Sequence, residues 1–430
     1  MTTNDTNSRL RLIVYVGIDI AKVKNDVLVE LPNGTRKKMR VLNRLEDFQS
    51  FAAYLKSLGA QCEIGLEASG NYHRPIAYFL QKEGFKVNLI SSLALSRTRE
   101  ALHNSWDKND PKDAQVILHM MKAGVKQVYF DPVHNGFNDL QELSKTHFEI
   151  SRQKMKVQHS ILTHYLPLYF PEAQKYFCSS RAEWFSMMLH HFPSPHFIQK
   201  MSQEEFIQKA WKLAGRKVAK RAFLEDYYHT ASQSIALPLE EGSSSVTMFR
   251  LILQEHIHLC QRRQEIEDQA HEKLKEDRRY QVLRSLPGVG PIIALTILAE
   301  TGDFKRFKHH RQYLKFCGLD LSTHQSGQFR GQSKLSKRGN RYLRCAFWMA
   351  ATIAIRMREN TFRKKYRRYI HRDPENPDLK RKAYTAAMAK MARVVYGLMK
   401  HDSFYRPYFE EAIPSGRIRS VAAVEAQRTS

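Results

Sequence analysis

The chain has 430 residues, of which 69 are Lys or Arg and 43 are Asp or Glu, so its formal charge is +26. An apolar share of 42% is enough for packed cores and excludes a wholly disordered chain, and the length predicts two or three domains. The positive charge predicts a polyanionic partner. Nucleic acid is favoured over a membrane surface because the basic residues spread through several segments and do not flank an apolar anchor.

Targeting and redox signals are weak. The longest apolar stretch, around 346–355, is too short to span a bilayer. The first residues, MTTNDTNSRLRL, lack the apolar centre of a signal peptide, so we expect a cytoplasmic protein with no membrane partner. The five cysteines have no CxxC spacing, which predicts neither a disulfide framework nor a zinc site but reduced residues in or near a core.

Residues from about 12 to 128 read as alternating strands and helices. The expected strands are 12–16, 26–31, 36–42, 62–66 and 86–90, and the expected helices lie near 45–58 and 72–83. Because the first three strands are consecutive and crossover units follow, the pattern favours a mixed α/β sheet of the RNase H type.

Four carboxylates in this region form the first candidate site. Asp19 lies at the end of the first expected strand, where Gly17 allows close backbone packing, and Glu67 follows the fourth strand in the same way. Asp110 and Asp113 are three residues apart at the start of a helical stretch, so they share one helix face. Two strand ends and one helix end can therefore bring the four side chains together.

Such a cluster repels itself unless a cation compensates it, and oxygen ligands suit Mg²⁺ or Mn²⁺ better than zinc. A metal site of this kind indicates phosphoryl transfer. A single carboxylate at a strand end is more often a cap or a solvated edge residue, and Asp26 and Asp107 fit that description. The ordered set of four favours the metal site.

The middle of the chain is predicted to be helical. Apolar spacing predicts long helices over 138–166 and 246–283, which pair as an antiparallel hairpin or as an intermolecular coiled coil. Between them, 167–245 is rich in His, Phe and Tyr and reads as a helical insertion without an assigned chemistry. The glycine-rich segment 286–291 precedes an apolar helix over 292–299, and it is either a phosphate-binding turn or a simple tight turn between helices.

The second candidate site is a segment rich in serine, glycine and cations. A serine there is a candidate nucleophile, but Ser322, Ser326, Ser333 and Ser336 are hardly distinguishable by local chemistry, and each also suits a phosphate hydrogen bond or a cap. The cations expected to bind nucleic acid are Lys22, Arg330, Lys334, Lys337, Arg338, Arg341 and Arg344. Basic clusters with interleaved tyrosines at 363–372 and 380–382 read as a further nucleic-acid face or as a solvated helix face.

Six motifs in this order resemble one family. They are GIDIAK, GLEASGNY, KNDPKDA, SLPGVGPIIA, FCGLDLSTHQSG and SKRGNRYLR. Together they resemble the DEDD transposases of the insertion-sequence one-hundred-ten (IS110) family, which are bridge-RNA-guided recombinases, over roughly 12–128 and 280–400. The resemblance implies the following domains: a RuvC-like catalytic domain at 10–130, a coiled-coil linker at 131–283 with an insertion at 167–245, a C-terminal transposase domain at 284–400 and a flexible tail at 401–430.

The resemblance also implies roles for individual residues. Asp19, Glu67, Asp110 and Asp113 match the four acidic metal ligands, and Ser326 matches the nucleophilic serine of the QSG step. It implies that Mg²⁺, with Mn²⁺ as a substitute, activates the serine, which forms a phosphoserine link to DNA. The implied partners are double-stranded DNA at the element ends and target, a structured non-coding guide RNA, and further copies of the chain in a dimer or tetramer, where one site can combine domains of two subunits.

Two other functions remain open at this stage. One is a Mg²⁺-dependent, structure-specific nuclease of the RuvC or RNase H type, in which water is the nucleophile and the C-terminal part only binds DNA. The other is a nucleic-acid binder without catalysis, in which the carboxylates are structural; it predicts strongly salt-dependent binding and no metal-dependent strand change. The ordered set of four acids favours an enzyme.

Overall fold

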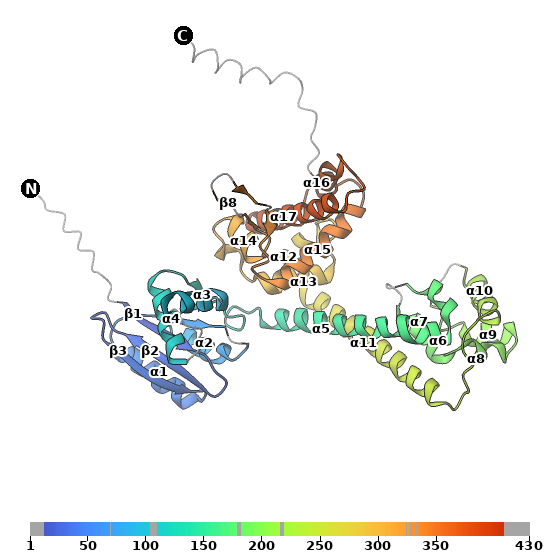
Figure 1. The fold of residues 1–430 in the computed structure, drawn as a ribbon, viewed down its shortest axis with the longest axis horizontal. Helices are drawn as coiled ribbons and strands as arrows, with labels where there is room; N and C mark the ends of the chain where they lie inside the picture. Colours follow the sequence, from blue (N-terminus) through green and yellow to red (C-terminus); the bar gives the residue numbers. More distant parts are fainter. Residues whose placement is uncertain are drawn as a thin grey trace, which may run out of the picture. The chain divides into compact units, whose positions relative to one another are not determined.

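A computed structural model describes most of the chain as two compact units, Met1–Asn138 and Asp139–Ser430 (Figure 1). The described residues are 13–68, 70–103, 110–178, 182–215, 219–323, 325–326, 329–331 and 333–407. The predicted tail at 401–430 therefore lies outside the described residues from 408 onward.

The N-terminal unit is built on a six-stranded sheet. Its strands are β1 Ile13–Asp19, β2 Lys24–Glu30, β3 Arg36–Leu42, β4 Gln61–Glu67, β5 Lys86–Ile90 and β6 Gln127–Val128, in the order β3-β2-β1-β4-β5-β6. The first three strands form an antiparallel meander, β4 and β5 run parallel to β1, and β6 pairs antiparallel with β5. This order and these directions are those of the RNase H fold, so the predicted fold of the N-terminal region is confirmed.

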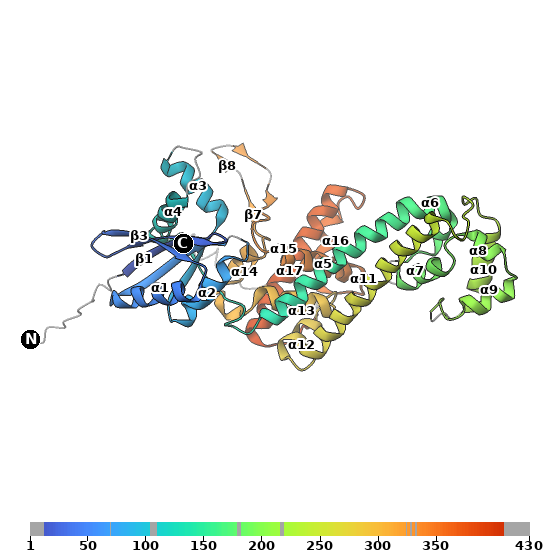
Figure 2. The same cartoon turned by 90° about the horizontal axis from the view of Figure 1, so that it is seen from below.

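Helices cover both faces of this sheet. Figure 2 shows α1 (Leu45–Ser57) and α2 (His73–Lys82) on one face and α3 (Ser92–His103) and α4 (Asp110–Lys122) on the other. Strand alternation explains the two layers, because β1 sends Val14, Val16 and Ile18 into the core shared with α1 and α2 and turns the intervening residues toward α4. The sequence pattern did not predict α3, and β1 extends three residues beyond the predicted strand end, to Asp19 itself.

The second unit is mostly helical. Its main helices are α5 (Asn138–Ser160), α6 (Leu166–Tyr169), α7 (Ala182–His191), α8 (Pro195–Gln199), α9 (Gln203–Ala210), α10 (Lys220–Ser232), α11 (Ser244–Leu274), α12 (Arg278–Arg284), α13 (Pro291–Thr301), α14 (His310–Phe316), α15 (Arg341–Arg356), α16 (Thr361–Ile370) and α17 (Pro377–His401). Two short ribbons, β7 (Leu321–Ser322) with β10 (Lys334–Leu335) and β8 (Gln325–Ser326) with β9 (Phe329–Arg330), separate α14 from α15.

Helices α5 and α11 lie side by side and antiparallel (Figure 2). Lys273 Nζ contacts Asp139 Oδ2 at 2.6 Å near one end of the pair, and His147 Nε2 lies 3.1 Å from Glu267 Oε1 further along. The single helix predicted over 246–283 is wrong: it is split into α11 and α12, because the Asp277 side chain accepts a hydrogen bond from the backbone N–H of Arg279 and starts a new helix.

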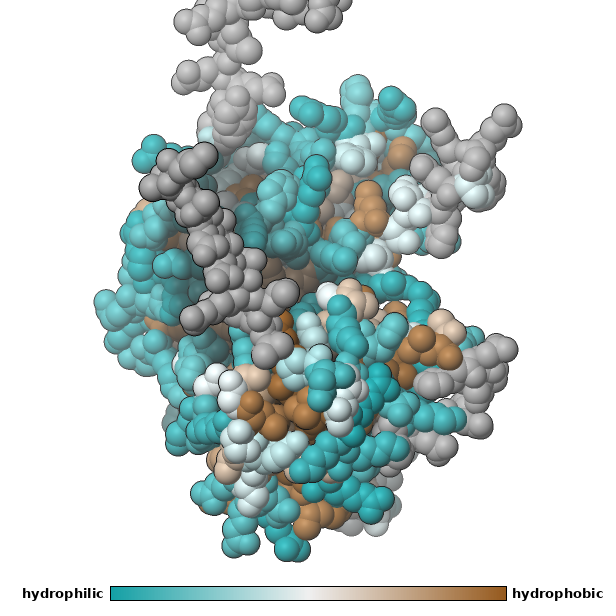
Figure 3. Space-filling model, turned by 90° about the vertical axis from the view of Figure 1, so that its left-hand side faces the viewer, coloured by the Kyte–Doolittle hydropathy of each residue, from teal (hydrophilic) through white to brown (hydrophobic). Residues whose placement is uncertain are grey.

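The surface is largely polar. On the face drawn in Figure 3, hydrophilic side chains predominate and apolar ones form small patches. Within the described part of the chain, no helix is both long and apolar enough to cross a membrane. Cys62 and Cys317 are buried, but Cys178 is exposed, so the predicted near-core position is wrong for Cys178.

Candidate active site

Two of the four predicted carboxylates lie at neighbouring strand ends. In the parallel pair of β1 and β4, Ile18 is opposite Leu66, so Asp19 and Glu67 are the next residues along the two strands. Ile18 and Leu66 are fully buried in the core beneath α1 and α2. Because side chains alternate along a strand, Asp19 and Glu67 face the opposite side, which is the side of α4. The structure thus brings these two carboxylates together at one edge of the sheet.

A pair of glycines lets α4 approach this edge. Gly17 and Gly65 are register partners in β1 and β4. A Cβ atom at Gly17 would collide with the carbonyl oxygen of Ala114, and one at Gly65 would lie 2.5 Å from Cγ of Met121. Because neither residue has a side chain, the backbone of α4 packs directly on β1, and the sequence motif around Asp19 needs its glycine for that reason.

The direction of α4 places its acidic end at the same edge. Near the C-terminal end of α4, Lys122 Nζ contacts Glu30 Oε1 at 2.6 Å, and Glu30 is paired with Tyr15 early in β1. The opposite end of α4, with Asp110 and Asp113, therefore lies toward the end of β1. Asp110 is the first residue of α4, but its side chain is outside the described part of the structure.

Asp113 is buried and paired. Its side chain is 2% exposed, and Arg99 of α3 binds both carboxylate oxygens, with Nε 2.5 Å from Oδ1 and Nη2 2.9 Å from Oδ2. This bidentate pair satisfies the buried charge of Asp113. Arg99 was not among the predicted site residues, because the apolar pattern does not predict the helix that carries it.

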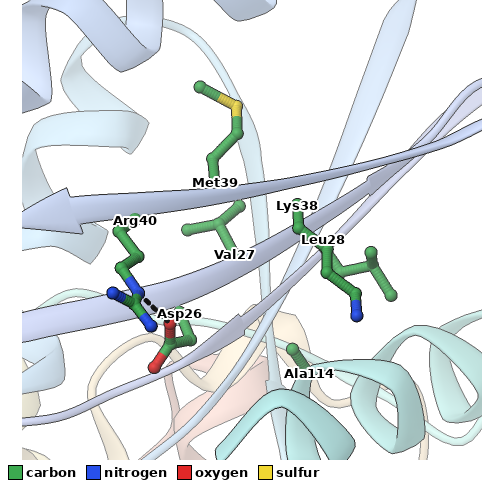
Figure 4. A pocket seen from close by; sticks show the side chains of 7 residues that line it. All are labelled: Asp26, Val27, Leu28, Lys38, Met39, Arg40 and Ala114. Carbon is green, nitrogen blue, oxygen red and sulfur yellow. Dashed lines mark ion pairs between the residues drawn. The ribbon is translucent and has the colours of Figure 1, made fainter.

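A further carboxylate lies opposite Asp19 on β2, and two cations lie on the next strand, β3. Asp26 of β2 is directly opposite Asp19 in the β1–β2 ladder, and its Oδ1 lies 3.5 Å from Nε of Arg40 on β3. Asp26, Arg40 and Lys38 line a hollow of about 250 Å³ that also reaches Ala114 of α4 (Figure 4). Asp26, which the sequence suggested to be a cap or edge residue, is thus the ladder partner of a candidate ligand. Side chains alternate along β3, so Lys38 and Arg40 lie on one face. The same alternation is visible in the sequence, although neither residue was predicted to belong to a site.

The donor chemistry at this edge fits a hard divalent cation, because the residues that converge there offer only carboxylate oxygens. Among the described residues, which do not include the side chain of Asp110, no three His, Cys, Asp or Glu side chains lie close enough to hold a metal ion. Asp19 and Glu67 are the residues best placed to hold the cation. Asp113 joins them only if Arg99 releases it.

Ser326 lies in the second unit, on a short β-ribbon. It is opposite Phe329 in the pair of β8 and β9, and its side chain is exposed. In Figures 1 and 2, β8 stands away from the helices of its own unit. An exposed hydroxyl on such a ribbon is accessible to a large substrate.

Gly318 and Gly339 lie where the segment that carries the two ribbons joins the helices, and we call this place the base of the ribbon. A Cβ atom at Gly339 would lie 2.5 Å from the carbonyl oxygen of Phe316 and 2.6 Å from the N atom of Gly318. Ser336 donates its hydroxyl to Asp320 and its N–H to the Asp320 carbonyl oxygen at 2.9 Å. Both the hydroxyl and the N–H of Ser336 are therefore used in hydrogen bonds within the fold. This excludes Ser336 from the four serines considered as the nucleophile.

Most of the predicted phosphate-binding cations surround this base. Lys334, Lys337, Arg338 and Arg341 are exposed, while Arg344 is half-buried and donates from Nη1 to the Lys337 carbonyl oxygen at 3.1 Å. The side chain of Arg330 is outside the described residues, and Lys22 is exposed in the first unit. The serine and these cations therefore belong to one surface region, apart from Lys22.

The glycine-rich segment 286–291 packs tightly inside the second unit. Gly288 has φ +82°, and a Cβ atom there would collide with the carbonyl oxygen of Ala350 in α15. Val289 N–H donates to the Leu286 carbonyl oxygen at 3.2 Å. This close helix contact favours the tight-turn alternative over a phosphate-binding turn.

The order and directions of the strands define an N-terminal domain of the RNase H fold. A family model described as "Transposase IS116/IS110/IS902 family" matches 280–367, and a second, for the DEDD transposase of IS110 elements, matches 16–171. The two matches together cover more than half of the chain. The chain belongs to the IS110 family of DEDD transposases.

Relatives agree with this family. The chain is 28% identical over 195 residues to "Probable family 20 transposase" of Pseudomonas aeruginosa, a match that covers 44% of this chain and 54% of the relative. It is 22% identical over 347 residues to "Insertion element IS116 uncharacterized 44.8 kDa protein" of Streptomyces clavuligerus, covering 80% and 84%. The chain thus spans about half the length of the first relative and most of the second.

Among solved structures, the chain is similar to RuvC of Thermus thermophilus in complex with a Holliday junction substrate. The match has 9% identity and a TM-score of 0.20, and it covers 27% of this chain and 99% of that one.

Proposed function

We propose that this protein is a DNA transposase that cuts and rejoins double-stranded DNA at the ends of an insertion sequence and at its target. The observation that carries the proposal is the register of β1 and β4, which makes Asp19 and Glu67 neighbours at the end of an RNase H-like sheet toward which the start of α4 is directed. Membership of a family of DEDD transposases supports a reaction on DNA at this edge.

The proposed reaction is a transesterification. Ser326 Oγ forms a bond to phosphorus while the bond from phosphorus to one sugar oxygen breaks; the serine proton passes to solvent or a carboxylate, and the sugar oxygen takes up a proton. Attack by a sugar hydroxyl of the new strand then reverses these changes and frees the serine. A Mg²⁺ ion held by Asp19, Glu67, Asp110 and Asp113 would neutralise charge that develops on the phosphate oxygens. The cations around the ribbon would hold the neighbouring phosphates.

The partners follow from the same proposal. We infer that a non-coding guide RNA chooses donor and target by base pairing, as in other guided systems, and that the chain acts as a dimer or tetramer. In the proposed domain plan, 10–130 supplies the acids, 131–283 forms the linker and 284–400 supplies the serine. The charge of +26 supports binding to nucleic acid, because phosphate contacts dominate such affinities.

The test is a covalent adduct. Purified full-length protein is incubated with Mg²⁺, DNA carrying the element junction and RNA transcribed from the flanking non-coding region, and the products are run on a denaturing gel. We expect a protein–DNA adduct with the wild type and with Ser333→Ala, an exposed serine of the same segment, and none with Ser326→Ala. DNA binding should be nearly equal in all three.

The other outcomes decide between mechanisms. An adduct that persists in Ser326→Ala rules out this nucleophile. Cleavage without an adduct in both proteins identifies a nuclease that uses water, and Asp19→Asn should then still abolish cleavage. Asp19→Asn with full activity removes the carboxylates from the reaction altogether.

A further inference from the structure

A second hollow in the N-terminal unit lies at the same end of the sheet as Asp19 and Glu67, on the side of α1 and α2. It measures about 540 Å³ and lies between the start of α1, the start of α2 and the β1–β2 loop. The rings that line it belong to Phe48, Tyr72, Tyr78 and Phe79, and its cations are Lys22 and Arg44. We call it the aromatic pocket.

The aromatic pocket is tied to the ends of the strands that carry the carboxylates. Lys22 follows Asp19 by three residues, and Tyr72 follows Glu67 by five. β3 ends beside the first residues of β2, which places the start of α1 at the same edge. The pocket and the carboxylates therefore lie at the same end of the sheet, the pocket on the side of α1 and α2 and the carboxylates toward α4. A strand whose phosphate lies at Asp19 and Glu67 would reach the pocket around the loop that carries Lys22.

Two amide side chains, of which Asn25 is buried and Asn43 is exposed, hold one wall of the pocket in place. Asn43 Nδ2 donates to the carbonyl oxygens of Ala21 at 3.0 Å and Lys22 at 2.9 Å. Asn25, which is fully buried, donates from Nδ2 to Asn43 Oδ1 at 2.7 Å. These bonds fix the loop after Asp19, so Lys22 starts from an ordered backbone.

The lining suits a nucleotide. Phe48 and Phe79 form the floor, with ring centroids 5.7 Å apart, while the Tyr72 side chain is 49% exposed at the mouth. Among the residues that the structure describes, neither Lys22 nor Arg44 forms an ion pair, so both are available to a phosphate. Exposed aromatic rings beside unneutralised cations are the arrangement with which proteins bind unpaired bases and the attached backbone.

We propose that the aromatic pocket binds the unpaired base of a DNA nucleotide next to the phosphate that is cut, with Tyr72 stacking on the base and Lys22 and Arg44 holding the adjacent phosphate. This inference rests on the proposed function, because the carboxylates determine which phosphate lies at the edge. A base drawn out of its stack would fix the register of the strand before any bond breaks.

The test needs no catalysis. Short single-stranded DNA with 2-aminopurine at one position is titrated with full-length protein in EDTA, and fluorescence quenching and affinity are measured. We expect quenching with the wild type, with Tyr72→Phe, which keeps the ring, and with Val128→Ala, an exposed residue of β6. Tyr72→Ala should lose most of the quenching and bind about tenfold more weakly, the size of one lost base–aromatic stack.

Two results would overturn the proposal. The first is equal quenching in Tyr72→Ala and the wild type. The second is stronger quenching with an RNA strand of the same sequence, which would reassign the pocket to RNA. Failure of the proposed function is seen separately, as an absent adduct with intact quenching. In the cutting reaction, an abasic nucleotide next to the cut should slow the wild type but not slow Tyr72→Ala any further.

Discussion

The pairing of Asp113 with Arg99 stabilises a buried carboxylate at the acidic edge. A carboxylate that is 2% exposed is costly to bury, and a bidentate arginine compensates that cost. If Asp113 is a metal ligand, Arg99 and the cation compete for the same oxygens. This competition can be measured through the thermal stability of the protein with and without Mg²⁺, and the measurement needs no activity assay.

Arg99→Ala should unfold at a lower temperature than the wild type in EDTA, because it leaves Asp113 buried without its partner; the expected loss is about 3 kcal/mol. Mg²⁺ should raise the melting temperature of the variant more than that of the wild type, since ligand binding stabilises the folded state. Calorimetry with and without Mg²⁺ checks this. Equal Mg²⁺ shifts in both proteins would show that Asp113 does not bind the cation.

At the residue scale, the sequence predicted that Asp19 and Glu67 lie at neighbouring strand ends, because a strand end is visible as an apolar run followed by a carboxylate. It did not predict Arg99, because an ion pair between two helices leaves no periodic signal. Asp26 was predicted to be only a cap or edge residue for a related reason. Its position opposite Asp19 depends on the register of the β1–β2 hairpin, which cannot be read from the sequence alone.

The contact of α4 with β1 is the element-scale feature on which the site depends. Gly17→Ala should destabilise the N-terminal unit by about 1–3 kcal/mol, because the new methyl group meets the backbone of α4, which cannot rotate away. Gly65→Ala should cost less, since its nearest neighbours are side-chain atoms of Met121 and Ile117 rather than backbone. Hydrogen exchange of β1 and α4 peptides, measured by mass spectrometry, gives both values.

Gly397 provides the matched control. It lies within α17, and a Cβ atom there would have no neighbour within 4 Å. Gly397→Ala should therefore stabilise its helix by about 0.5–1 kcal/mol. A Gly17→Ala protein with unchanged exchange in β1 and α4 would mean that α4 does not pack as described.

The contact of α7 with α11 should depend on pH. His256 of α11 is 1% exposed, and its Nδ1 lies 2.8 Å from Ser186 Oγ of α7. Burial, assisted by the positive charge of Lys154, lowers the pKa of His256 from 6.5 to about 4. Between these values the unfolded chain binds a proton that the folded chain does not, so stability rises with pH across this window.

Lowering the pH from 7 to 5 should therefore cost the helices around His256 about 2 kcal/mol. His256→Gln, which cannot titrate, should lose that part of the pH dependence. Urea denaturation followed by fluorescence of Trp184 in α7 measures the difference. Parallel pH dependence in the wild type and the variant would assign the effect to other groups.

At the element scale, most strands of the N-terminal unit were predictable from period-two patterns, whereas the break between α11 and α12 was not. The charged run between Leu274 and Tyr280 contains no Gly or Pro that would mark a helix end, and the capping bond of Asp277 starts the second helix there. Caps depend on a single side chain, so a long periodic segment conceals them.

The charge of the whole molecule is unevenly distributed. Residues 277–407 contain 29 Lys and Arg against 9 Asp and Glu, whereas the insertion over 167–245 contains 9 against 8. Its aromatic side chains are largely used inside its own core, around Phe185, Phe206, Tyr227 and Phe249. Phosphate binding should therefore depend on the C-terminal helices and scarcely on the insertion.

Lys382 of α17 and Lys212, which follows α9, are both exposed lysines and allow a matched comparison. Lys382→Ala should weaken DNA binding and reduce the slope of log K against log salt by about 1, because one phosphate contact is lost. Lys212→Ala should leave both unchanged. Affinities measured over a series of salt concentrations give the slopes. If the two variants lose equal slope, the insertion contributes to the nucleic-acid surface despite its near-neutral charge, and the partition of roles between the two regions is wrong.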